Sequence, residues 1–231
     1  MLQIHSPNFA TALLDYSRCP IGIIEKSSTF TIVNKPQETT LILEEVKMIT
    51  KADLDKLNSK DPKIKYGFTK ELLKIGSEDP EQLYEHLDYW AELMTSDNNI
   101  LKWTAIDLVG YLSAVDKDNR IDSLIPDLLK HLHGGMLITC NHSIFALGLI
   151  CQNRPNLKEK ILEELISISK DKFETNECKN IATGKVLEVI KPFVADIKNN
   201  KSVITFVENA TKSDRNATRK RAEQLLKKIS K

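Results

Sequence analysis

The stretch NNILKWTAIDLVGYL, residues 98 to 112, decides the fold because it recurs in altered form along the chain. The segments that align with it are DPKIKYGFTKELLKI from Asp61, MLITCNHSIFALGLI from Met136, NECKNIATGKVLEVI from Asn176 and NATRKRAEQLLKKI from Asn216. Between the aligned positions named below, the offset from copy to copy rises from 37 to 40 residues. A sequence period of this size is typical of repeat proteins in which each unit is a pair of helices.

Three columns of this alignment place apolar side chains on one face of a helix. Their spacing is i, i+4 and i+7, which is the spacing of a single helix face. The first column is mostly small, so a neighbouring helix can come close there. The columns are Phe68, Ala105, Ser143, Ala182 and Ala222; Leu72, Val109, Leu147, Val186 and Leu226; and Ile75, Leu112, Ile150, Val189 and Ile229.

A further helical pattern precedes several of the copies. Residues 81–95, 121–132 and 157–168 each carry one apolar stripe at helical spacing. Pro80 and Pro155 mark the starts of units, because proline suits the first turn of a helix and not its middle. Each unit is therefore expected to be helix, short turn, helix. The chain as a whole is predicted to be all-α, a right-handed α-solenoid of about five helix pairs.

The predicted solenoid covers residues 41–231, and Asn98 is a natural helix cap at a tight turn inside one unit. Residues 1–40 do not belong to the repeats. They contain the β-prone run SSTFTIVN and are broken by prolines. We expect this N-terminal extension to be weakly structured or disordered, because its apolar content is thin. A loose hairpin packed on the first unit is the alternative.

The period, together with the run Asp61, Pro62, Ile64 and Lys65, resembles the HEAT-repeat family, whose solenoids are of the armadillo type. The resemblance covers the chain from about residue 42 to its end. In particular, KYGFTKELLK, NNILKWTAIDLVGYLSAVD and ECKNIATGK are similar to a microbial group of short HEAT-repeat proteins to which no activity is assigned. A solenoid of this kind implies that the second helices of the units line a concave face.

One column of the alignment is basic in all but one copy. We call it the basic column: Lys65, Lys102, Cys140, Lys179 and Arg219. The resemblance implies a structural role, in which each cation bonds carboxylates and carbonyls at the turn of the next unit and so builds a ladder. Asp61 and Asp97 are suitable acceptors. The alternative is a basic strip that binds an acidic or phosphate-bearing partner.

The next column along is Tyr66, Trp103, Asn141, Asn180 and Lys220, which we call the neighbouring column. Two aromatics, two amides and a lysine do not make a core, but all can bond or stack. Trp is also a frequent anchor of protein interfaces. We therefore expect this column to face a partner. The alternative is that Trp103 packs between helices with its N–H bonded to a backbone carbonyl.

The segment HLHGGMLITCNH, residues 131 to 142, gathers metal-ligand residue types, yet its spacing argues against a metal site. His131 and His133 lie two positions apart, as do Cys140 and His142, and such side chains on a helix diverge by about 200°. The chain contains no GxSxG, HExxH or CxxC motif and no glycine-rich phosphate loop. We therefore expect no metal, no cofactor and no catalytic residue.

The function hypothesis is a non-enzymatic scaffold or adaptor that binds protein through its concave helical face. The net charge is only +1, although residues 198–231 are strongly basic. Nucleic-acid binding is the alternative, with a relation to alkylbase DNA glycosylases, since Asp107 lies one turn after Trp103 and that family uses an aromatic cleft with an Asp. A small-molecule lyase or a chaperone on the same scaffold is a third alternative. No apolar run approaches the ~20 residues of a membrane span, so a cytoplasmic protein is expected; the oligomeric state is left open.

Overall fold

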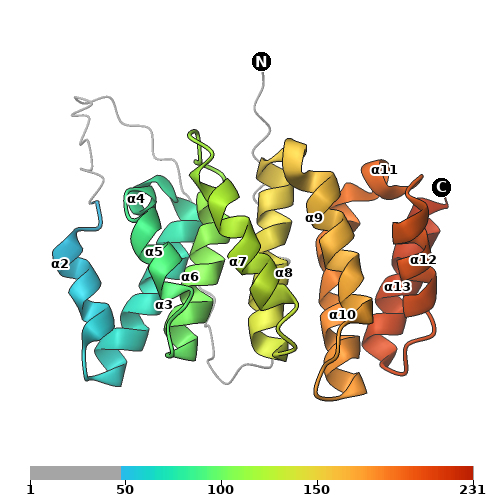
Figure 1. The fold of residues 1–231 in the computed structure, drawn as a ribbon, viewed down its shortest axis with the longest axis horizontal. Helices are drawn as coiled ribbons and strands as arrows, with labels where there is room; N and C mark the ends of the chain where they lie inside the picture. Colours follow the sequence, from blue (N-terminus) through green and yellow to red (C-terminus); the bar gives the residue numbers. More distant parts are fainter. Residues whose placement is uncertain (1–47, 231) are drawn as a thin grey trace, which may run out of the picture. The chain divides into compact units, whose positions relative to one another are not determined.

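The computed structural model describes residues 48 to 230, and every regular element in that range is a helix. The helices follow one another as five units, each with a first helix, a tight turn and a second helix (Figure 1). The predicted all-α solenoid of helix pairs is confirmed. The predicted N-terminal extension, residues 1–40, and the first residues of the predicted solenoid lie outside the described residues.

The second helix of each unit is a single long helix. Within the described part of the chain, none of the helices is both long and apolar enough to cross a membrane. These helices pack on one another in order along the chain, and we call them the second-helix row. They are α3 (Pro62–Glu78), α6 (Asn99–Leu112), α8 (Leu137–Asn153), α10 (Asn176–Ile190) and α13 (Asn216–Ile229).

The first helices are shorter and usually joined to a 3₁₀ turn. In Figure 1, α5, α7 and α9 lie in front of the second-helix row. The elements of this first-helix row, in order, are α2 (Lys51–Leu54) with η1 (Asp55–Asn58), α4 (Glu81–Tyr84) with α5 (Leu87–Leu93), η2 (Arg120–Leu124) with α7 (Ile125–Leu132), α9 (Pro155–Ser167) with η3 (Ile168–Lys170), and η4 (Lys191–Phe193) with α11 (Val194–Ile197) and α12 (Lys201–Ala210).

The connections lie along two opposite edges (Figure 1). The tight turns within units lie at the bottom of the view, where every second helix begins, and we call this the turn edge. The segments between units lie at the top, and we call this the loop edge. The turn-edge segments are residues 59–61, 94–98, 133–136, 171–175 and 211–215, and the loop-edge segments include residues 79–80, 113–119 and 154.

The core is built from the three predicted apolar columns. The first column is buried in every unit, and all three columns are buried in the second, third and fourth units. In the first and last described units Ile75, Leu226 and Ile229 are only half-buried, because among residues 48–230 each of these units packs on a neighbouring unit on one side only. The predicted cap is also confirmed, since Asn98 Oδ1 accepts hydrogen bonds from the N–H groups of Ile100 and Leu101.

Two glycines allow adjacent second helices to pack closely. A Cβ atom on Gly110 of α6 would lie 2.7 Å from the Cα of Ala146 in α8. A Cβ atom on Gly148 of α8 would lie 2.6 Å from a methyl carbon of Val189 in α10. Any larger residue at either position would therefore push the two helices apart.

The loop edge is held by a buried charge network around Arg154. Its guanidinium donates to Asp116 Oδ2 at 2.9 Å and to Asp122 Oδ2 at 3.1 Å. The Tyr84 hydroxyl donates to the other oxygen of Asp116 at 2.7 Å. Burial, with this bond to Asp116, raises the pKa of Tyr84 to about 12. Because these residues come from the second unit, the third unit and the segment that opens the fourth, the network joins three consecutive units.

Candidate interaction surface

The predicted binding residues all lie in the first two turns of second helices, next to the turn edge. Every one of them is half-buried. Because the second helices pack side by side in order, the structure brings these residues into one row along that edge. They are Lys65 and Tyr66 on α3, Lys102 and Trp103 on α6, Asn141 on α8, Lys179 and Asn180 on α10, and Arg219 on α13.

The basic column does not form the predicted ladder. Among residues 48–230, Lys65, Lys102 and Lys179 make no side-chain hydrogen bond and no ion pair. The expected acceptor Asp61 instead caps its own helix through the N–H of Lys63 at 2.8 Å. Only Arg219 bonds a turn carbonyl, and that turn belongs to its own unit. The alternative, a basic strip that binds a partner, stays a prediction.

The neighbouring column supplies the bonds between units that the basic column lacks. The Trp103 indole N–H donates to Thr139 Oγ1 of the next unit at 3.0 Å. The Tyr66 hydroxyl also bonds the next unit, but as an acceptor: Asn98 Nδ2 donates to it at a longer 3.4 Å. The alternative interpretation of Trp103, packing between helices, was therefore nearer to the structure, although its acceptor is a hydroxyl and not a carbonyl.

Asn180 continues this pattern between the fourth and fifth units. Its side-chain oxygen accepts from Ser213 Oγ at 2.9 Å, and its backbone carbonyl accepts from Thr218 Oγ1 at 2.7 Å. Asn141 is the exception, because its Oδ1 atom is buried and has no hydrogen bond to a described residue. Most of the hydrogen-bonding groups of the neighbouring column, which were expected to bond a partner, thus bond the next unit.

Trp103 also belongs to a packed cluster between α6 and α8. Its ring stacks on the His142 imidazole with centroids 5.5 Å apart and planes 7° apart. His142 Nδ1 lies 2.8 Å from Asp107 Oδ1, and Asp107 is 1% exposed. A glycosylase-like site needs an aromatic cleft that presents its carboxylate to a ligand. This cluster instead buries the carboxylate against an imidazole.

The other residues of the histidine-rich segment are engaged in packing. His133 Nδ1 lies 2.6 Å from an oxygen of Asp171. Burial lowers the pKa of His131, and it raises the pKa of the Cys140 thiol to about 12. Among the described residues, no group of three or more His, Cys, Asp or Glu side chains is placed to hold a metal ion.

Large apolar side chains are exposed mainly at the turn edge. They lie at the starts of α3, α6 and α8, and we call them the apolar strip: Ile64 (49% exposed), Ile100 (37%), Met136 (67%) and Ile138 (52%). The sequence carried a signal for two of them. Ile100 and Ile138 lie five positions before the buried Ala105 and Ser143, which is about 140° around the helix from the core face.

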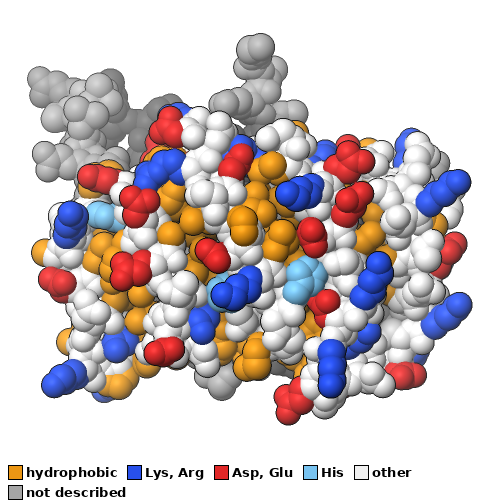
Figure 2. Space-filling model, viewed as in Figure 1, with side chains coloured by type: hydrophobic (Ala, Val, Ile, Leu, Met, Phe, Trp, Pro, Cys, Tyr) orange, Lys and Arg blue, Asp and Glu red, His pale blue; other side chains and the backbone are white. Residues whose placement is uncertain are grey.

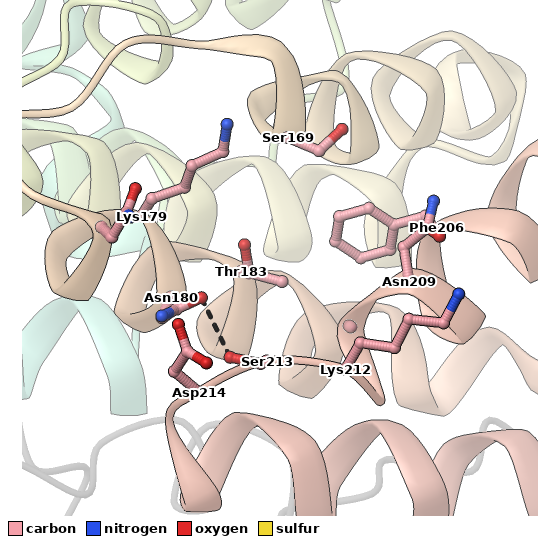
Figure 3. Close-up of a pocket in the computed structure, with 11 residues that line it drawn as sticks. Ser169, Lys179, Asn180, Thr183, Phe206, Asn209, Lys212, Ser213 and Asp214 are labelled. Atoms are coloured by element: carbon pink, nitrogen blue, oxygen red, sulfur yellow. Dashed lines mark hydrogen bonds between the residues drawn. The ribbon is translucent and has the colours of Figure 1, made fainter.

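A groove of about 460 Å³ opens at the turn edge between the fourth and fifth units (Figure 3). Its side chains come from α10, from α12 and from the turn that follows α12, with Ser169 of η3 nearby. Lys179 and Asn180 of the predicted set are part of its lining. Phe206 of α12 and Lys212 of the turn after it could not be found from sequence, because only tertiary packing places α12 and this turn beside α10.

By contrast, acidic and basic side chains are interspersed over the face on which α5, α7 and α9 lie (Figure 2). No single-sign field covers that face. Electrostatics therefore favours no partner there.

No family model matches the sequence, and no curated protein matches it. Among solved structures, the chain is similar to a designed armadillo repeat protein, with 17% identical residues and a TM-score of 0.41. The similarity covers 77% of this chain and 98% of that chain. At this level of similarity, the fold assignment rests on the chain's own helix pairs.

Proposed function

We propose that the chain is a non-enzymatic scaffold that binds a segment of another protein along its turn edge. The apolar strip is the observation that carries this proposal. Of the five large apolar side chains exposed among the described residues, only Met48 lies outside the starts of α3, α6 and α8. Three consecutive second helices therefore present aliphatic side chains on the same edge.

The grouping matters more than the exposure itself. Single exposed apolar side chains are ordinary on protein surfaces. Apolar side chains gathered on one edge indicate a surface that is covered in a complex. Burying one aliphatic side chain completely contributes about 1.5–3 kcal/mol, so covering several half-exposed ones supplies a useful part of a binding free energy.

The charges beside the apolar strip indicate the chemistry of the partner. Lys65 and Lys102 lie one and two positions after Ile64 and Ile100, and neither forms an ion pair within residues 48–230. A partner segment with both aliphatic and acidic side chains would match this edge. Such charge complementarity fixes specificity and speeds association more than it raises affinity.

A protein partner fits this edge better than a nucleic acid. Single-stranded nucleic acids bind where aromatic rings are free to stack on bases. In the described part of the chain no large exposed apolar side chain is aromatic, and the Trp103 ring is already stacked on His142. The unpaired lysines alone would give weak binding that salt abolishes.

The test is a selection of random twelve-residue peptides on the full chain, followed by anisotropy with the labelled peptides that are enriched. We expect peptides with aliphatic and acidic residues. The double variant Ile100→Asp with Ile138→Asp should weaken their binding by at least about tenfold, because two apolar contacts become unfavourable.

Met48→Asp is the matched control, since Met48 is exposed to a similar extent but lies away from the turn edge. It should leave binding unchanged, and far-ultraviolet circular dichroism should show that all variants remain folded. No enrichment over the bare matrix, or equal loss in both variants, would contradict the proposal. Salt-sensitive binding of a labelled duplex that disappears when Lys65, Lys102 and Lys179 become alanine would favour the nucleic-acid alternative.

A further inference from the structure

The groove between α10 and α12 lies on the same edge as the apolar strip. The strip ends on α8 with Met136 and Ile138, and the groove begins with the first turns of α10, the next second helix. A segment that lies on the strip and continues along the edge would reach the groove. The apolar strip and the groove could therefore contact different parts of one bound segment.

Two lysines flank the groove from opposite sides. Figure 3 shows Lys179 extending from α10 on one side and Lys212 from the turn after α12 on the other. Neither lysine has an ion pair among the described residues. Asp214 is the one carboxylate in the lining, and it lies beside Asn180, away from Lys212. An anionic group in the groove would thus lie between two positively charged side chains.

The uncharged lining suits a polar group as well. Thr183 lies in the middle of the groove (Figure 3), and the lining also includes the amides of Asn176 and Asn209. None of these side chains has a hydrogen bond to another described residue. Phe206 supplies an apolar side that can cover methylene groups. This is the lining expected for a side chain with a short apolar stem and a charged end.

From this arrangement we infer that the groove binds an acidic side chain, Asp or Glu, of the same partner segment that covers the apolar strip. The inference rests on the proposed function and adds to it one acidic residue of the partner segment, with the groove as its binding site. The strip binds aliphatic side chains, and the groove binds a carboxylate farther along the segment.

The spacing of the units sets how far along that carboxylate lies. Packed helices are about 8–10 Å apart, and the groove lies one to one and a half such steps beyond α8. The distance to span is therefore about 10–15 Å. An extended segment rises about 3.3 Å per residue, so the acidic residue follows the aliphatic ones by about three to five positions. A helical segment rises 1.5 Å per residue and needs about seven to ten.

The experiment compares two labelled peptides on the full chain by anisotropy. One carries two leucines followed about four residues later by two glutamates, and its twin has glutamines in place of the glutamates. The protein variants are Lys179→Ala with Lys212→Ala and, as a matched control of equal charge change, Lys198→Ala with Lys201→Ala. Both control lysines are exposed and belong to the same unit as Lys212.

We expect the groove variant to bind the glutamate peptide about threefold to tenfold more weakly and the glutamine twin unchanged. The difference should shrink in high salt, because exposed charges are screened. The control variant should bind both peptides like the original protein. If the control weakens binding as much as the groove variant, or if both peptides respond equally to the groove variant, the inference is wrong.

The outcomes separate the inference from the proposed function. Binding that depends on Ile100 and Ile138 but not on the lysines would overturn the groove and leave the scaffold proposal standing. Binding of the glutamate peptide that depends on Lys179 and Lys212 but not on the isoleucines would retain the groove and overturn the apolar strip. If the original protein binds neither peptide, both proposals fail.

Discussion

The loop edge of this solenoid and the basic column at its turn edge use their charged residues in opposite ways. At the loop edge, Arg154 and Asp116 are buried and bonded to each other, and Asp116 also accepts from Tyr84 and from two backbone N–H groups. At the turn edge, Lys65 and Lys102 have no such partners within residues 48–230 and lie beside exposed aliphatic side chains. The charged residues of the loop edge thus bond across units, whereas among the described residues these two lysines of the turn edge do not.

The difference shows that a repeated residue type in a repeat protein does not reveal its role. The lysines recur at the same position in several units, which suggested a ladder. The actual network at the loop edge is built from residues that do not recur, such as Arg154 and Tyr84. Substituting charged side chains at each edge and measuring the stability therefore tests the difference between the two edges.

The largest effect is expected from Arg154→Ala. The substitution leaves the carboxylate of Asp116, whose side chain is 0% exposed, without its cation. Loss of one partner of a buried ion pair typically costs about 3–5 kcal/mol, and we expect that loss in the free energy of unfolding measured with urea. Arg120→Ala is the control, because its partner Asp88 is exposed and the pair should contribute less than about 1 kcal/mol. Equal losses would mean that the buried pair at the loop edge stabilises the protein no more than an exposed pair there.

A smaller loss is expected from Asp107→Ala, which removes the buried carboxylate that faces His142 at 2.8 Å. Leaving a buried donor without its acceptor costs about 1–3 kcal/mol. Asp107→Asn should lose less, because the amide oxygen can still accept a hydrogen bond. Thermal unfolding of both variants shows which of them loses more stability. An alanine variant as stable as the original protein would show that the contact between Asp107 and His142 does not stabilise the packing of α6 on α8.

The combined substitution of Lys65, Lys102 and Lys179 by alanine should leave stability nearly unchanged. Surface substitutions away from special contacts stay within about 0.5 kcal/mol each, and these lysines have no bonded partners among the described residues. The urea midpoint of the triple variant, compared with that of the original protein, measures the change in stability. If the free energy of unfolding falls as much as in Arg154→Ala, the lysines stabilise the contacts between units after all, as the ladder hypothesis predicted.

The smallest effect concerns pH. Burial lowers the pKa of His131 below its usual value of 6.5, against a hydrogen bond to the backbone of Met94 that raises it, and the nearby charge of Lys102 adds to the lowering. The unfolded chain therefore binds a proton more readily than the folded one, and this contribution to stability is lost as pH falls from 6.5 through the folded pKa. His131→Gln should remove that part of the acid destabilisation, so the stability difference between the two proteins should be constant near pH 8 and change as the pH falls below 6.5. Urea midpoints of both proteins between pH 8 and 5 test it, and parallel curves would contradict it.

Much of the fold was predictable because its determinants are local. The i, i+4, i+7 columns specify helices with one apolar face, and these columns are fully buried in the second, third and fourth units. Pro155 begins α9, and Asn98 caps α6. Each of these features depends on residues within a few positions of one another, so a single sequence contains the necessary information.

The partners of the polar residues could not be predicted in this way. Trp103 and Thr139 are 36 positions apart, and Arg154 and Asp116 are 38 apart. Whether such residues meet depends on how far one helix pair slides and turns on the next. That register is set by close packing, for example of Gly148 against Val189. The sequence by itself thus determined the helix pairs and their order, while only tertiary packing decided which charges are buried and bonded and which have no ion pair among the described residues.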